Sequence, residues 1–301
     1  VQRRIMSDSC IAVINKPSGI SSSDVVIKCR NAYSHAIEKK IKCGHMGTLD
    51  PMASGILIIA FGNATRLFDF ALKKEKSYIA TFTFGEERDT LDATGKLTRR
   101  SELPIYKHIL DILPNFIGNI MQVPPKYSAV NINGKRAYDL ARKGKEFDIK
   151  AKEVFIRDIK VIDEALDGDL CKNITLSIEC GSGTYIRSLC RDIAESVESV
   201  AYMSKLVRNE CAGFEIGDEH TVDFTDFLAN PLNFVFNTTT LVDRLMPSIK
   251  IDDSEYFKLR NGQSVSINAE NGIYSVIFID DLTFIIKVDN KKAKSICYLG
   301  D

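Results

Sequence analysis

The chain has 301 residues, of which 45% are hydrophobic and 27% are charged, and its 40 basic side chains balance 40 acidic ones. This is ordinary globular composition. Because no apolar run is long enough to span a membrane and no secretory leader opens the chain, we expect a cytoplasmic protein. The eight cysteines form no C-x-x-C pair, which disfavours a zinc site and fits a reducing compartment.

The zero net charge conceals an uneven distribution. Residues 1–45 hold eight Lys/Arg against three Asp/Glu, and residues 126–152 hold the same numbers, whereas residues 211–255 hold two against nine. Basic regions suit contact with phosphate groups, although such charges also serve simply to solvate a surface. The net charge therefore does not exclude a nucleic-acid partner.

The first predicted elements are a strand at Cys10–Asn15 and a helix that begins near Ser21–Ser23. Between them, the Lys-Pro-Ser-Gly sequence at 16–19 predicts a turn. The serines are favourable N-cap residues, and apolar side chains then recur at helical spacing as far as Ala36. This region is therefore expected to be a strand, a turn and an amphipathic helix.

The stretch GHMGTLDPMASG, which begins at Gly44, is the most informative part of the chain. Pro51 disfavours helical dihedrals at Asp50, and the apolar run Ile56–Ala60 predicts a buried strand. An acidic side chain therefore projects from a stiff loop just before a core strand, which suits a functional group. The alternative is a turn in which Asp50 only accepts hydrogen bonds from nearby backbone amides.

The next elements are predicted by periodicity. In chain order they are a short helix at Ala64–Leu72, a strand at Tyr78–Phe84, a polar connection at Gly85–Thr98, an amphipathic helix at Ser101–Leu113, paired strands at Val154–Ile162 and Asn173–Cys180, and a helix that ends at Val197. On the strand from Tyr78 to Phe84, alternate apolar residues share one face. We assign only loop structure, and no chemistry, to the polar connection.

The segment Met121–Lys152 combines Pro-Pro and Asn-Gly with many basic residues and with Tyr127 and Tyr138. Basic residues interleaved with aromatic ones suit contact with RNA phosphates and unstacked bases. A solvated helical hairpin is the alternative that the residues alone leave open.

Several of these stretches together resemble the TruB family of tRNA pseudouridine synthases. The matching runs are GHMGTLDPMASGILIIAFGNATR for the family's signature loop, NKPSGISSSDVV for its first motif, KSYIATFTFG for its K-x-Y motif, GTYIR for its arginine motif, and PPKYSAVNINGKRAYDLARKG for a segment before an RNA-gripping loop. Met46 departs from the Thr or Ala expected after His45, and it is interpreted as packing differently against RNA.

The resemblance implies a role for each site residue. Asp50 is the expected catalytic residue, and Arg187 is expected to pair with it. Tyr78 and Leu206 are expected to sandwich a flipped uracil. The other expected substrate-binding residues are His45, which would fill the space that the target base leaves, Tyr185, which would line the pocket, and Lys16, in the Lys-Pro turn. The reaction is redox-neutral and needs no phosphate donor, so we expect no metal and no cofactor.

The implied fold is α+β. A catalytic domain with a mixed, largely antiparallel sheet of the pseudouridine synthase type is expected over residues 1–245, with an RNA-gripping insertion at about 124–152 that is mobile before RNA binds. A small β-rich, PUA-like RNA-binding domain is expected over residues 246–301.

The implied activity is isomerisation of uridine to pseudouridine at position 55, in the T-loop of tRNA, by a monomer that binds the T-stem-loop. Two alternatives stay open: a pseudouridine synthase that depends on a guide RNA, and a non-catalytic protein that binds or folds tRNA. The sequence does not decide whether Asp50 attacks the nucleotide or assists the departure of uracil.

Overall fold

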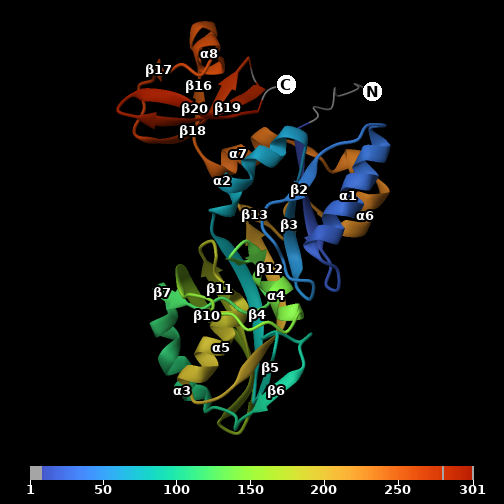
Figure 1. Cartoon of the computed structure of the whole chain (residues 1–301), viewed down its shortest axis with the longest axis vertical. Helices are drawn as coiled ribbons and strands as arrows, with labels where there is room; N and C mark the ends of the chain where they lie inside the picture. Colours follow the sequence, from blue (N-terminus) through green and yellow to red (C-terminus); the bar gives the residue numbers. More distant parts are fainter. Residues whose placement is uncertain (1–8, 280, 300–301) are drawn as a thin grey trace. The chain divides into compact units, whose positions relative to one another are not determined.

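The computed structural model of the chain describes residues 9–279 and 281–299 (Figure 1). The chain forms two compact units. One contains the described parts of residues 1–49, 56–74 and 211–301, and the other contains residues 50–55 and 75–210. In the described part of the chain, no helix is both long enough and apolar enough to cross a membrane.

The first unit begins with a small mixed group of strands that is covered by helices. The strands of this group are β1 (Cys10–Lys16), β2 (Cys43–His45), β3 (Ser54–Phe61), β13 (Phe214–Glu215), β14 (Thr221–Asp223) and β15 (Phe236–Asn237). The first two residues of β3 belong to the second unit. The first helices of the first unit are α1 (Ser22–Ala36), α2 (Phe68–Leu72), α6 (Phe224–Ala229) and α7 (Thr238–Leu245). β1 pairs in parallel with β14 and antiparallel with β15, and β2 pairs antiparallel with β3. Figure 1 shows α1 and α6 lying alongside these strands.

β1 and β3 are buried on both faces, which explains their continuous apolar sequences. Ile11, Ile56 and Ile58 pack into one hydrophobic cluster, whereas Ala12 and Leu57 pack into another. The prediction of a buried strand at Ile56–Ala60 is confirmed. β3 follows directly after the loop that carries Asp50.

The C-terminal part of the first unit is a five-stranded sheet, as expected for a PUA-like fold. Its elements are β16 (Ser248–Lys250), α8 (Asp253–Arg260), β17 (Val265–Ser266), β18 (Gly272–Phe278), β19 (Asp281–Asp289) and β20 (Lys292–Tyr298), with the strand order β16-β18-β19-β20-β17. Val276, Phe284 and Ile286 form the centre of its core. The domain boundary between residues 245 and 246 stays a prediction.

The second unit contains an antiparallel array of strands in the order β4-β11-β10-β7. β12 is the neighbour of β4 on the other side. The strands of the second unit are β4 (Lys76–Phe84), β5 (Glu86–Arg88), β6 (Leu97–Arg100), β7 (Gly118–Gln122), β8 (Asn131–Ile132), β9 (Lys135–Arg136), β10 (Lys152–Asp167), β11 (Leu170–Cys180) and β12 (Ala201–Cys211). Its helices are α3 (Tyr106–Ile112), α4 (Ala137–Arg142) and α5 (Ile186–Ser196). Both α3 and α5 lie beside this sheet in Figure 1.

Periodicity predicted the buried face of β4 in this unit, but two other expectations were wrong. The connection at Gly85–Thr98, expected to be only a loop, contains β5 and the start of β6, which pair as a hairpin. Tyr78 and Phe82 are buried on one face of β4, as the alternation predicts. The helix expected at Ser101–Leu113 instead begins at Tyr106. The residues before it run extended, because Ile105 forms a β-bridge with Leu170. A long-range strand contact therefore overrides the local helical pattern.

Candidate active site

The loop that carries Asp50 is fixed on both sides. Before it, the hydroxyl of Ser22 donates to the carbonyl of Leu49 at 2.7 Å and accepts from its N–H at 2.8 Å. After it, the N–H of Ala53 donates to the carbonyl of Asp50 at 3.1 Å and closes a turn over Pro51-Met52. The carboxylate therefore projects from a backbone that is held at each end.

Gly55 allows the end of this loop to join the sheet. It pairs with Arg208 where β3 runs beside β12. Its φ is +107°, and a Cβ at this position would collide with the carbonyl oxygen of Arg208. Only glycine combines this dihedral angle with so close an approach of two backbones.

Arg187 meets Asp50 through a two-pronged contact. Its Nε lies 2.8 Å from Oδ2 and its Nη2 lies 3.1 Å from Oδ1, the fork geometry that makes arginine–carboxylate pairs strong and directional. The guanidinium also donates to the carbonyls of Thr90, through Nη1, and Tyr127, through Nη2, each at 2.9 Å. Arg187 is 5% exposed, whereas the side chain of Asp50 is 30% exposed. The cation is thus enclosed, and the carboxylate keeps an accessible side.

The first turn of α5 sets the position of Arg187. Tyr185, the N-cap residue, donates its N–H to Oε1 of Gln122 at 2.8 Å. The hydroxyl of Ser188 donates to the carbonyl of Val123 at 2.8 Å. These bonds tie the start of α5 to the segment that follows β7, so the arginine approaches Asp50 from a rigid base.

Asp92 is a site residue that sequence reasoning missed. Its Oδ2 lies 3.7 Å from Nη1 of Arg187, and both side chains are almost completely buried. Its Oδ1 accepts hydrogen bonds from the hydroxyl of Thr90 (2.8 Å) and from the N–H (2.9 Å) and hydroxyl (2.6 Å) of Thr94. Hydroxyl residues two positions to either side of an acid signal a carboxylate-centred turn, but nothing local points from that turn to Arg187.

Three further predicted residues lie in the same unit. Tyr78 on β4 and Leu206 on β12 are 8% and 5% exposed, and their strands are neighbours in the sheet. Tyr185 is half-buried. Burial raises the pKa of its phenol, the charge of Arg187 lowers it, and the nearby Asp50 carboxylate raises it. Tyr185 therefore shares the electrostatic environment of the ion pair.

Lys16 and His45 belong to the other unit. The ammonium group of Lys16 is buried and donates to the carbonyls of Pro17 (2.8 Å) and Ile20 (2.7 Å), which stabilises the Lys-Pro turn. His45 is half-buried on β2, opposite Ile59 of β3. Their roles toward a substrate stay predictions. The following residue, Met46, is completely buried in the hydrophobic core, so it packs against protein.

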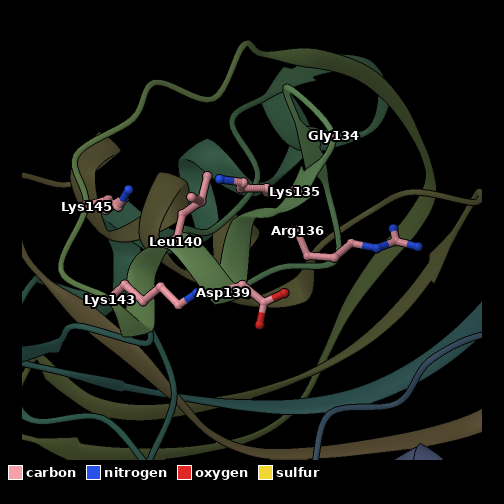
Figure 2. Close-up of a pocket in the computed structure, with 7 residues that line it drawn as sticks. All are labelled: Gly134, Lys135, Arg136, Asp139, Leu140, Lys143 and Lys145. Atoms are coloured by element: carbon pink, nitrogen blue, oxygen red, sulfur yellow. The ribbon is translucent and has the colours of Figure 1, made fainter.

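The insertion between β7 and β10 presents a basic hollow. β8 and β9 form a hairpin whose two turn residues, Asn133 and Gly134, both have positive φ (48° and 82°), as the tight turn of such a hairpin requires. Between this hairpin and α4 lies a hollow of about 410 Å³. Figure 2 shows its polar lining, which consists of Lys135, Arg136, Asp139, Lys143 and Lys145. Four cations against one carboxylate favour an anionic ligand.

Comparison with known proteins places the chain in a family. Residues 34–186 match the model of the TruB family pseudouridylate synthase N-terminal domain. The chain is 35% identical to the tRNA pseudouridine synthase B of Caulobacter vibrioides, over 84% of this chain and 79% of that protein. It is 36% identical to the protein of the same name from Ehrlichia ruminantium, over 85% of each.

Solved structures share the fold at low sequence identity. The crystal structure of a Cbf5-Nop10-Gar1 complex contains a chain with a TM-score of 0.71 and 20% identity, which covers 97% of this chain and 85% of that one. A structure of an H/ACA RNP bound to a substrate RNA gives a TM-score of 0.70 at 18% identity, with the same coverage. The fold is thus the expected α+β fold with a PUA-like C-terminal part. From the family match and the extent of the sequence identity, the chain belongs to the TruB family of pseudouridylate synthases.

Proposed function

We propose that this protein isomerises uridine to pseudouridine in tRNA, at position 55 of the T-loop. The observation that carries the proposal is the fork between Asp50 and Arg187, which joins the aspartate of the signature loop to the arginine of the G-T-Y-I-R motif. In this reaction the N1–C1′ bond breaks, the uracil turns, and a C5–C1′ bond forms, while C5 loses a proton and N1 gains one. Nothing is oxidised and no group is transferred from a donor, so we propose that the reaction needs neither metal nor cofactor. We also propose that the enzyme is a cytoplasmic monomer.

In this proposal Asp50 is the catalytic residue. It either attacks the nucleotide or assists the departure of uracil, and both routes need an accessible carboxylate in a fixed orientation. Arg187 supplies that orientation, because it grips both carboxylate oxygens while its other donors are bound to backbone carbonyls. Its role is to hold Asp50, and it is therefore a positioning residue.

The target base must leave its stack before the glycosidic bond can be reached. We propose that Tyr78 and Leu206 enclose the flipped uracil, that Tyr185 lines the same pocket, and that His45 fills the space the base vacates. We propose that Lys16 contributes to substrate binding by stabilising the Lys-Pro turn of the first motif. Each buried base–aromatic contact contributes about 1–3 kcal/mol to binding.

The role of Tyr78 is tested by two substitutions. Tyr78→Phe keeps the ring and should slow turnover only mildly, whereas Tyr78→Ala removes the stacking surface and should raise KM or lower kcat by about tenfold or more. Steady-state kinetics on unmodified tRNA measures kcat and KM for the two variants. Equal losses in the two variants would show that the hydroxyl group, rather than the ring, is the critical part.

The basic hollow of the insertion is proposed to contact RNA phosphates. In the described part of the chain, Lys143 and Lys145 form no salt bridge, so both ammonium groups are available to an anion. Reversing both charges should weaken tRNA binding and reduce the slope of log Kd against log salt by about 0.7–0.9 for each lost contact. The rate at saturating tRNA should change much less than the affinity.

A matched control uses a lysine elsewhere in the same unit. Lys172 pairs with Asp167 at the far end of the β10–β11 hairpin, so Lys172→Glu changes the net charge without touching the hollow. An unchanged salt slope in the Lys143/Lys145 variant, or an equal change in Lys172→Glu, would contradict the contact.

The activity itself is tested by incubating the pure protein with a bare, unmodified tRNA transcript and mapping pseudouridine chemically. Conversion of one uridine in the T-loop is the expected result. One alternative is a guide-dependent enzyme, which would be inactive without an added guide RNA. A protein that only binds or folds tRNA would bind the transcript and convert nothing.

A further inference from the structure

The loop at the tip of the β5–β6 hairpin, residues 89–96, forms one wall around Arg187. The carbonyl of Thr90 accepts from Nη1 of Arg187 at 2.9 Å, and Oδ2 of Asp92 lies 3.7 Å from the same nitrogen. Where this loop sits therefore helps to determine the plane of the guanidinium that grips Asp50.

The loop is rigid by itself. Leu91 has a φ of +60°, and a side chain at Gly95 would collide with the Thr90 hydroxyl. The Asp92 carboxylate binds three donors inside the loop. Because these contacts join the residues of the loop to one another, a shift of the loop at Ala93 and Gly95 is expected to displace Thr90 and Asp92 as well.

Arg88 contacts the loop at Ala93 and Gly95. Its Nη1 donates to the carbonyls of Ala93 at 3.3 Å and Gly95 at 3.1 Å. Its guanidinium carbon lies 4.4 Å from the centre of the Tyr202 ring, within the range of a cation–π contact. The next residue of β12, Met203, exchanges backbone hydrogen bonds with Leu91 (3.0 Å) and Ala93 (3.1 Å). The loop is thus held on β12 by the backbone bonds of Met203 and by Arg88, which bridges the Tyr202 ring and the two loop carbonyls.

The Nε of Arg88 is buried and has no acceptor in the described part of the chain. Its hold on the loop comes from Nη1 and from the flat face against Tyr202. A lysine could supply a charge and a donor here, but it lacks the planar group that stacks on the ring while reaching two carbonyls.

We propose that Arg88, stacked on Tyr202, is a positioning residue for the isomerisation. It holds the loop that presents Thr90 and Asp92 to Arg187, and through Arg187 it sets the orientation of Asp50. This inference rests on the proposed function, since it concerns the rate of that reaction. It predicts that Arg88 affects the chemical step and leaves tRNA affinity unchanged.

The test compares four variants of the full chain with unmodified tRNA. Arg88→Ala and Tyr202→Ala should each lower the single-turnover rate at saturating tRNA by about tenfold, because a small misplacement of catalytic groups is enough for such a loss. The Kd for tRNA should stay within about twofold of the wild-type value. Tyr202→Phe keeps the ring and should react at the wild-type rate, and Arg88→Lys should be intermediate.

Chemical rescue gives a readout that general destabilisation would not produce. Methylguanidinium ions should restore part of the rate of Arg88→Ala, because they can occupy the space between the Tyr202 ring and the two carbonyls. They should not restore Tyr202→Ala. Arg99→Ala is the matched control, since Arg99 forms an exposed ion pair with Glu87 in the same hairpin, 2.9 Å long, and this variant should keep the wild-type rate.

The outcomes are separable. If the wild-type protein forms no pseudouridine, the proposed function fails. If the wild type is active and folded Arg88→Ala is equally fast, or Arg99→Ala is equally slow, only the role of Arg88 is overturned. Should circular dichroism show Arg88→Ala to be unfolded, the contrast between Tyr202→Ala and Tyr202→Phe decides, and equal rates in those two overturn the role of Arg88.

Discussion

Replacing Asp50 by asparagine is expected to abolish pseudouridine formation while the protein stays folded and still binds tRNA. Asparagine has nearly the same size, and its carbonyl oxygen can still accept a hydrogen bond from Arg187, so the turn over Pro51-Met52 should persist. The substitution removes the negative charge, and an amide is a far poorer nucleophile or base than a carboxylate. Chemical mapping measures the product, circular dichroism the fold, and a binding assay the affinity.

Asp89→Asn provides the control for this experiment. Asp89 lies in the loop beside Arg187 but is exposed, and its carboxylate accepts a hydrogen bond from the N–H of Lys96. It should keep the wild-type rate. Asp92→Asn is unsuitable as a control, because Asp92 faces Arg187. Turnover near the wild-type rate by folded Asp50→Asn would remove Asp50 from the mechanism.

The second large effect is expected for Arg187→Lys, which should lower the rate at saturating tRNA by about a hundredfold. A lysine keeps the positive charge, but its single ammonium group cannot grip both oxygens of Asp50 and also fill the carbonyls of Thr90 and Tyr127. Asp50 would then lose its fixed orientation. Single-turnover rates, measured together with the Kd for tRNA, separate this effect from a loss of binding.

Arg191→Lys is the matched control, one turn further along α5. Arg191 pairs with Asp192 and donates to the carbonyl of Val123, so the same substitution there should leave the rate almost unchanged. If Arg187→Lys instead weakened tRNA binding as much as it slowed the reaction, Arg187 would be a substrate ligand, and its role in orienting Asp50 would be refuted.

Local periodicity predicted those parts of the fold in which burial alone decides the structure. β3 is apolar from Ile56 to its end because both of its faces are covered there, and β4 alternates because its inward face is buried. The helix predicted to begin at Ser101 instead begins at Tyr106, after Ile105, which forms a β-bridge with Leu170. Such a contact depends on residues far away in the sequence, so no short window contains it.

The candidate site was predictable only in part, for a similar physical reason. Asp50 and Arg187 are 137 positions apart, and their pairing was expected from the family resemblance alone. The carbonyl groups of Thr90 and Tyr127 belong to the backbone, which every residue has, so no residue type signals them. Asp92 was visible only as one acid among several in a polar connection, and its importance comes from the loop that turns it toward Arg187.

The spread of the Arg187 contacts along the chain also fixes when the site can form during translation. Its partners lie near residues 50, 90 and 127, so all of them leave the ribosome before the arginine does. A nascent chain that ends at residue 186 contains the whole region matched by the family model and lacks the group that orients Asp50. Because domains fold as units once enough chain has emerged, the Asp50–Arg187 pair forms only after most of the second unit has been synthesised.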